Sequence, residues 1–155
     1  MTRPSGETSV HKRLVAQRKG IVSLSQRPPP VIPGHMHIKV ISDLAILATG
    51  DGQFIFAASD DMDGMNLVDA DAYVSTVSSS GLPTIQLRNI TQAADMLSTR
   101  ITIDVSEFTS YTAAAPPVID LANDDLVMGD RIAIDVDVAG TGTKGLGIFL
   151  EFARP

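Results

Sequence analysis

A segment near the C-terminus has glycines at the spacing that is found in nucleotide-binding loops. Gly140, Gly142 and Gly145 reproduce the G-x-G-x-x-G pattern of dinucleotide-binding loops. Such a loop binds pyrophosphate only where it opens a helix, because the first N–H groups of the helix contact the anion. The following segment, residues 146–152, instead alternates apolar residues as a strand does. We therefore interpret residues 140–145 as a β-hairpin turn and expect no bound cofactor.

An acidic segment, residues 60–64, resembles part of a calcium-binding loop. In the register of an EF-hand, Ser59 would be the first ligand and Ala70 would occupy the position of the closing glutamate. Neither residue supplies the required carboxylate. We interpret the segment as an acidic surface turn, with a weakly held hydrated cation as the alternative. The same interpretation applies to Asp120, Asp124, Asp125 and Asp130.

The histidines are the remaining candidates for metal binding or catalysis. His35 and His37 lie two positions apart, so their side chains share one face if the segment is a strand. A metal site needs a third ligand, and none is evident at a plausible spacing from these two residues, while His11 lies apart in the N-terminal segment. A Ser-His-Asp site would need an activated serine, and the sequence has no nucleophile-elbow motif. We expect no catalytic residues and no metal site.

The composition indicates a single globular domain and excludes several other classes of protein. The 155 residues are 44% hydrophobic and 19% charged, as expected for a single globular domain. The absence of cysteine excludes disulfides and thiolate metal sites. No apolar run approaches the roughly 18 residues of a membrane span, and the N-terminal residues lack the apolar segment of a signal peptide. We expect a soluble protein made in the cytoplasm, with no membrane partner.

Charge is distributed unevenly along the chain. Residues 1–34 carry a net charge of +5, whereas residues 35–155 carry −11. The N-terminal segment ends in three consecutive prolines, which favour an extended polyproline II conformation. Its residues could span on the order of 110 Å if fully extended. We name residues 1–34 the arm and residues 35–155 the body, and the candidate partner-binding residues of the arm are Arg3, Lys12, Arg13, Leu14, Arg18, Lys19, Arg27, Pro28, Pro29 and Pro30.

The composition of the arm also indicates its partner. A polar segment of this length buries too little surface to offset the entropy lost on ordering, so we expect it to lie against another molecule. A disordered tail is the alternative. Basic residues can contact nucleic-acid phosphates, but the arm has no aromatic residue for base stacking, and the acidic body would repel a polyanion. The sequence therefore favours a protein partner over nucleic acid.

Alternation of apolar and polar residues in the body predicts strands and no long helix. This period-two pattern is typical of sheets with one buried face and one solvated face. Turn-forming clusters rich in glycine, proline, serine and aspartate separate the strands. We predict an all-β fold, a jelly-roll-like antiparallel β-sandwich with an extended N-terminal arm. The expected strands are residues 37–41 and 44–48, as one strand or two, then 53–57, 67–77, 84–90, 100–105, 131–138 and 146–152.

The alternation also predicts which side chains face the core. Where apolar residues recur at every second position, that face should be buried and the intervening polar residues should be solvated. Asp135 and Asp137 are accordingly expected to face solvent. The residues expected to face inward are Val68, Ala70, Ala72, Val74, Ile85, Leu87, Ile101, Ile103, Val105, Ile132, Ile134, Val136, Val138, Leu146, Ile148, Leu150 and Phe152.

A series of short motifs runs from Asp63 to Phe152. They include GMNLV at 64–68, IQLRN at 85–89, DMLSTRITID at 95–104, TAAAPPVID at 112–120, NDD at 123–125, GD at 129–130, IDVD at 134–137, GTG at 140–142 and KGL at 144–146. In this pattern of turns and strands, about 90 residues long, the chain resembles a module of tailed-bacteriophage structural proteins, including head-decorating, fibre and tail components. The arm lies outside the likeness.

The resemblance implies a β-sandwich virion part with no enzymatic role and no active-site residues. We expect a capsid decoration or head-fibre anchor subunit, located in the virion and attached through the arm to capsid or tail proteins of the same particle. It would be a homo-oligomer, with a trimer favoured. One alternative is a tail or fibre-base component. A second is a carbohydrate-binding module for host recognition, although aromatic residues are scarce and tryptophan is absent. A hydrolase on a β scaffold is a third.

Overall fold

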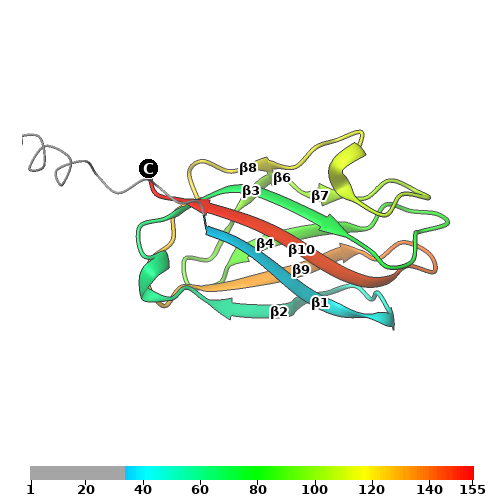
Figure 1. Ribbon diagram of the computed structural model, residues 1–155, viewed down its shortest axis with the longest axis horizontal. Coiled ribbons are helices and arrows are strands. Elements are labelled where there is room, and N and C mark those ends of the chain that lie inside the picture. The colour runs from blue at the N-terminus through cyan, green and yellow to red at the C-terminus, as the bar shows by residue number, and fades with distance from the viewer. Residues whose placement is uncertain (1–33) are drawn as a thin grey trace, which may run out of the picture. The chain divides into compact units, whose positions relative to one another are not determined.

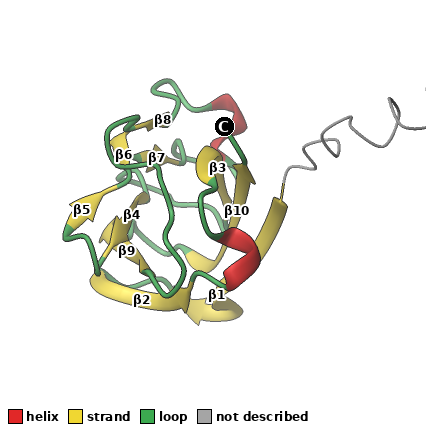
Figure 2. Cartoon of the chain, turned by 90° about the vertical axis from the view of Figure 1, so that its left-hand side faces the viewer, coloured by secondary structure: helices red, strands yellow, loops and turns green. Residues whose placement is uncertain are grey.

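The computed structural model describes residues 34–155, which form two antiparallel sheets face to face (Figures 1 and 2). Sheet A has the strand order β1 (Gly34–Ile46), β10 (Lys144–Ala153) and β3 (Asn66–Tyr73). Sheet B has the order β2 (Gly50–Ala57), β9 (Arg131–Val138), β4 (Thr84–Asn89) and β5 (Ala94–Asp95), and β7 (Ile101–Thr102) also pairs with β4. The remaining elements are the paired strands β6 (Leu97–Thr99) and β8 (Val118–Ile119) and the 3₁₀ turns η1 (Asp60–Met62) and η2 (Ser110–Thr112).

The all-β prediction is therefore confirmed for the body. No helix within residues 34–155 has the length and apolar character needed to cross a membrane. The first described residue and the C-terminal strand lie at the same end of sheet A, because Gly34 pairs with Phe152. Residues 1–33 are outside the described part of the chain.

The core lies between the two sheets and is formed by alternate residues of the longest strands. Ile148 of β10 and Ala72 of β3 face it from sheet A, and Ile134 of β9 and Leu87 of β4 face it from sheet B. Burial of such side chains stabilises each by about 1.5–3 kcal/mol relative to exposure. The inward residues predicted at 132, 134, 136, 146, 148, 150 and 152 are all buried.

Three predicted inward residues are instead exposed. Val68 is 47% exposed because a bulge in the pairing of β3 with β10 places one extra residue between Leu67 and Asp69, so Leu67 is buried in its place. Val105 is 40% exposed because β7 ends at Thr102 and the chain then turns. Val138 is 42% exposed at the very end of β9.

Candidate functional site

The outer face of sheet A carries three cross-strand rows of polar and aromatic side chains. Pairing of β1 with β10 and of β10 with β3 places His35 beside Glu151 and Asp69, and His37 beside Phe149 and Asp71. A third row joins Lys39, Gly147 and Tyr73. Because side chains alternate between the two faces of a strand, all nine positions project away from the core. Their grouping depends on strand order, which brings together segments far apart in the sequence.

An aromatic cluster occupies the middle of this face. The His37 imidazole stacks on the Phe149 ring, with centroids 4.7 Å apart and planes 25° apart. The Tyr73 ring lies 5.4 Å from the Phe149 centroid, and its hydroxyl is 2.9 Å from His37 Nε2. The Tyr73 ring covers Gly147, where a Cβ atom would overlap it. Glycine at this position therefore lets the tyrosine lie flat against the sheet.

An ion pair borders the aromatic cluster. Lys39 pairs with Asp43 and lies 5.1 Å from the centroid of the Tyr73 ring. The hydrogen bond from Lys39, together with one from Ser75, lowers the pKa of the Asp43 carboxyl below its ordinary value. The same Asp43 bond raises the pKa of Lys39. The positive charge of Lys39 is thus neutralised by Asp43 at the border of the aromatic cluster.

A pocket of about 330 Å³ opens on the same outer face of sheet A, next to the row of His35, Glu151 and Asp69. It lies on the side of the aromatic cluster opposite to Lys39. Phe149 and the 65% exposed Tyr111 contribute its aromatic surface. Tyr111 belongs to η2, which is held on β3 because the Ser110 hydroxyl accepts from the Ala72 N–H and donates to Asp71 at 2.7 Å. One hydroxyl therefore positions both a ring and a carboxylate of the pocket.

The charges around the pocket have one dominant sign. Asp69, Asp71 and Glu151 line it together with His35 and His37. His35 Nδ1 lies 3.8 Å from the Glu151 carboxylate. Within the described residues, neither lysine nor arginine lines this pocket. An aromatic surface combined with carboxylates is suited to bind a ligand that has both a flat face and hydrogen-bond donors.

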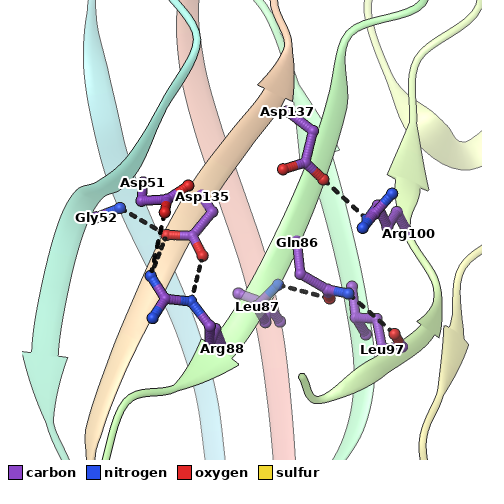
Figure 3. A network of polar contacts seen from close by, with 9 residues as sticks. All are labelled: Asp51, Gly52, Gln86, Leu87, Arg88, Leu97, Arg100, Asp135 and Asp137. Atoms are coloured by element: carbon purple, nitrogen blue, oxygen red, sulfur yellow. Dashed lines mark hydrogen bonds and ion pairs between the residues drawn. The ribbon is translucent and has the colours of Figure 1, made fainter. Parts of the chain in front are cut away.

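The outer face of sheet B is organised differently, around a partly buried ion pair between Arg88 and Asp135 (Figure 3). Arg88 Nε donates to Asp135 Oδ2 at 2.7 Å, and the backbone N–H of Gly52 donates to Oδ1. Asp135 projects from the outer face of β9, as predicted, but it is only 4% exposed, so the expectation that this face is solvated is wrong at this residue. The physical reason is that its charge is compensated by a partner on a neighbouring strand. The network is best explained as a structural one.

The histidine prediction is confirmed in one respect. His35 and His37 do project from the same face of β1 and line the same pocket. Within residues 34–155, no three histidine, aspartate or glutamate side chains are grouped as metal ligands. His11 lies outside the described residues.

The two motif-like loops have structural roles in the described part of the chain. Residues 140–145 lead into β10 as a turn, but they connect sheet B to sheet A, so the β-hairpin interpretation is wrong. The loop instead pairs with the segment around Ser79, whose N–H donates to the Thr141 carbonyl. At the acidic turn 60–64, Arg154 donates to the carbonyls of Asp61 and Asp63.

One acid of the 120–130 segment contradicts the surface-turn interpretation most clearly. Asp130 is 4% exposed, and its carboxylate accepts from Asn89, Gln92 and the Val127 N–H. Asp124 is also buried, at 7% exposure. The buried carboxylate of Asp130 thus accepts both from its own turn, at Val127, and from Asn89 and Gln92, which holds the loop before β9 against the end of β4.

The predicted arm residues are not placed by the structure. Arg3, Lys12, Arg13, Leu14, Arg18, Lys19, Arg27, Pro28, Pro29 and Pro30 all lie outside the described residues. Of the residues that line the pocket, the sequence analysis singled out His35 and His37, as a possible metal pair, but not the aromatic and acidic residues. Asp69 and Asp71 were recognisable as the polar face of one strand, but their approach to Phe149 and Tyr111 depends on sheet order and on the position of η2.

Comparison with known proteins gives no relative of this chain: no family model, no curated protein and no solved structure matches it.

Proposed function

We propose that this chain is a non-enzymatic structural subunit of a bacteriophage virion, a capsid decoration or head-fibre anchor held to the particle by its arm. The observation that carries the proposal is the division of charge at the start of β1. Residues 1–34 carry +5 and residues 35–155 carry −11. A basic, proline-rich segment attached to an acidic sandwich suits a tether that binds an acidic protein surface while the body projects into solvent.

We infer that the body has the jelly-roll topology. Successive long strands alternate between the sheets: β1 lies in sheet A, β2 in sheet B, β3 in sheet A and β4 in sheet B. The last two strands, β9 and β10, insert between earlier strands of sheets B and A respectively. Such alternation, with late strands paired to early ones, is expected of two interlocking Greek keys.

The proposal includes a homo-oligomer, with a trimer favoured. Two apolar side chains near the end of edge strand β1 support self-association, since Leu44 is 88% exposed and Ile46 is 71% exposed. Exposed apolar side chains beside an unpaired strand edge are features that subunit contacts commonly cover. Light scattering of the purified chain would measure the mass, and a Leu44→Ser/Ile46→Ser variant should shift it toward the monomer.

The attachment can be tested with three versions of the chain. One lacks residues 1–33, which leaves Gly34 and its pairing with Phe152 intact. In the second, the six basic residues of the arm are replaced by glutamine. The matched control is Arg131→Gln, which removes a positive charge from an exposed position of the body. Each is produced in phage-infected cells, and particles are separated on a density gradient.

We expect the wild-type and control chains to sediment with particles, whereas the truncated and neutralised chains stay in the soluble fraction. Association should also weaken as salt is raised, because arm contacts are screened at a Debye length of about 8 Å in physiological salt. Recovery with separated tails rather than heads would favour the tail or fibre-base alternative. If the truncated chain assembles as fully as the wild type, the arm does not provide the attachment.

A further inference from the structure

The pocket on the outer face of sheet A lies on the body and is separate from the tethering role proposed for the arm. Its aromatic side is fixed by packing. Phe149 is held by its 4.7 Å stack on His37, and Tyr111 is presented at the rim by η2. The Tyr111 side chain is 65% exposed, so its ring can be covered by a ligand. Two rings held from different elements provide a surface on which a planar group can stack.

The hydrogen-bonding side of the pocket is formed by carboxylates. Glu151 of β10 and Asp69 of β3 are direct cross-strand neighbours. Asp71, two residues further along β3, is oriented by its 2.7 Å hydrogen bond from Ser110. Like charges placed side by side favour a ligand that neutralises them. Among the basic side chains of the rows, His35 and His37 line the pocket, and His35 Nδ1 lies 3.8 Å from the Glu151 carboxylate. Lys39 is paired with Asp43 outside the pocket, so neither lysine nor arginine of the described residues compensates the three carboxylates.

We propose that this pocket binds the guanidinium group of an arginine side chain presented by a partner protein. A guanidinium is planar, stacks on aromatic rings and donates two parallel hydrogen bonds to a carboxylate. Phe149 and Tyr111 would receive its face, and Asp69 and Glu151 its N–H groups. A lysine ammonium lacks the flat face, and a neutral saccharide leaves the carboxylate charge uncompensated. The volume of about 330 Å³ accommodates one side chain.

The chain provides its own reporter for a binding experiment. Its two tyrosines are Tyr73 and Tyr111, and it has no tryptophan. Tyr111 lines the pocket and Tyr73 packs against Phe149. Tyrosine fluorescence of the full-length chain therefore reports on this face. The probes are a short acetylated and amidated Gly-Arg-Gly peptide, the same peptide with lysine, and the same peptide with citrulline, a neutral isostere of arginine.

We expect a saturable fluorescence change with the arginine peptide, at a dissociation constant on the order of 0.1–5 mM for a single side chain. The lysine peptide should bind about three- to tenfold more weakly, and the citrulline peptide should show no saturation in the same range. Free arginine amide should bind similarly to the peptide if the side chain alone is recognised. A series of neutral oligosaccharides tests the competing carbohydrate ligand.

Variants localise the binding. Glu151→Gln should weaken the arginine peptide about five- to tenfold by removing one charge-assisted interaction. Glu107→Gln makes the same chemical change at an exposed position outside the pocket and should leave binding unchanged. Tyr111→Ala removes the tyrosine that lines the pocket and leaves only Tyr73 as a fluorophore, so its binding is followed through the amide NMR signals of Asp69 and Glu151. It should weaken the peptide several-fold while the remaining spectrum keeps the dispersion of a folded sandwich.

Three results would overturn the proposal. The first is the absence of any saturable response to the arginine peptide, and the second is equal binding of the citrulline peptide. The third is tighter binding of a neutral oligosaccharide than of arginine, which would assign the pocket to carbohydrate recognition. None of these outcomes depends on whether the arm attaches the chain to a particle, so this inference and the proposed function fail separately.

Discussion

Removal of the guanidinium from Arg88 should destabilise the body by leaving a buried carboxylate without its cation. Asp135 is 4% exposed, and Arg88 Nε donates to it at 2.7 Å (Figure 3). Asp51 also lies 3.9 Å from this guanidinium, but its side chain is 81% exposed, so the loss of that second ion pair should contribute little. The change Arg88→Met keeps most of the side-chain stem, so the lost packing is small. The loss of stability in Arg88→Met should therefore arise mainly from the uncompensated charge of Asp135.

The size of the effect follows from the geometry. At 2.7 Å and an effective dielectric constant of about 20, the attraction is roughly 6 kcal/mol. Desolvation of the two charges offsets about half of that, because Arg88 remains about one-third exposed while Asp135 is buried. We therefore expect Arg88→Met to lower the free energy of unfolding by about 3 kcal/mol. Asp135→Asn should cost less, about 1–2 kcal/mol, because its amide oxygen can still accept from Gly52.

The assay is a double-mutant cycle measured by urea denaturation. Wild type, the two single variants and the double variant are followed by far-ultraviolet circular dichroism in the full-length chain. The double variant should be more stable than the sum of the single effects allows, with a coupling energy of about 1.5–2.5 kcal/mol. A coupling below about 0.5 kcal/mol would show that Asp135 does not depend on Arg88, since the two groups would then contribute independently.

Three further predictions use the same measurement. Gly147→Ala should cost about 1–2 kcal/mol, because the added methyl displaces the Tyr73 ring from the sheet; an unchanged midpoint would contradict that contact. Asp130→Ala should cost about 3 kcal/mol by leaving three donors without their acceptor; a loss under 1 kcal/mol would contradict its role. Asp43 has a lowered pKa, so its contribution is present above pH 3.8 and is lost as pH falls further. The stability difference between wild type and Asp43→Asn should therefore shrink below that pH, and a constant difference would contradict the pairing with Lys39.

The inward face of the long strands could be predicted from the sequence alone. Ile132, Ile134 and Val136 alternate without interruption, and all three are buried. Alternation is informative here because the strand runs straight through the sheet with one face on the core. Val68 could not be placed in the same way, since a single bulge in the pairing of β3 with β10 reverses the face of every residue beyond it.

The burial of Asp135 and the pocket on sheet A could not be predicted from local sequence patterns. Asp135 was expected to face solvent because it alternates with core residues, yet its burial depends on Arg88, 47 positions earlier in the chain. The pocket likewise requires β1, β10 and β3 to be neighbours and η2 to pack on β3. Each is a consequence of strand order, which the sequence pattern leaves undetermined.

Cross-linking mass spectrometry of assembled particles would identify the protein that the arm contacts. Lys12 and Lys19 belong to the arm, and Lys39 and Lys144 to the body, so an amine-reactive reagent reports on both parts of the same chain. We expect cross-links from Lys12 and Lys19 to join a different virion protein. Arm cross-links that lead only to the body of this chain, with none to another particle protein, would contradict attachment through the arm.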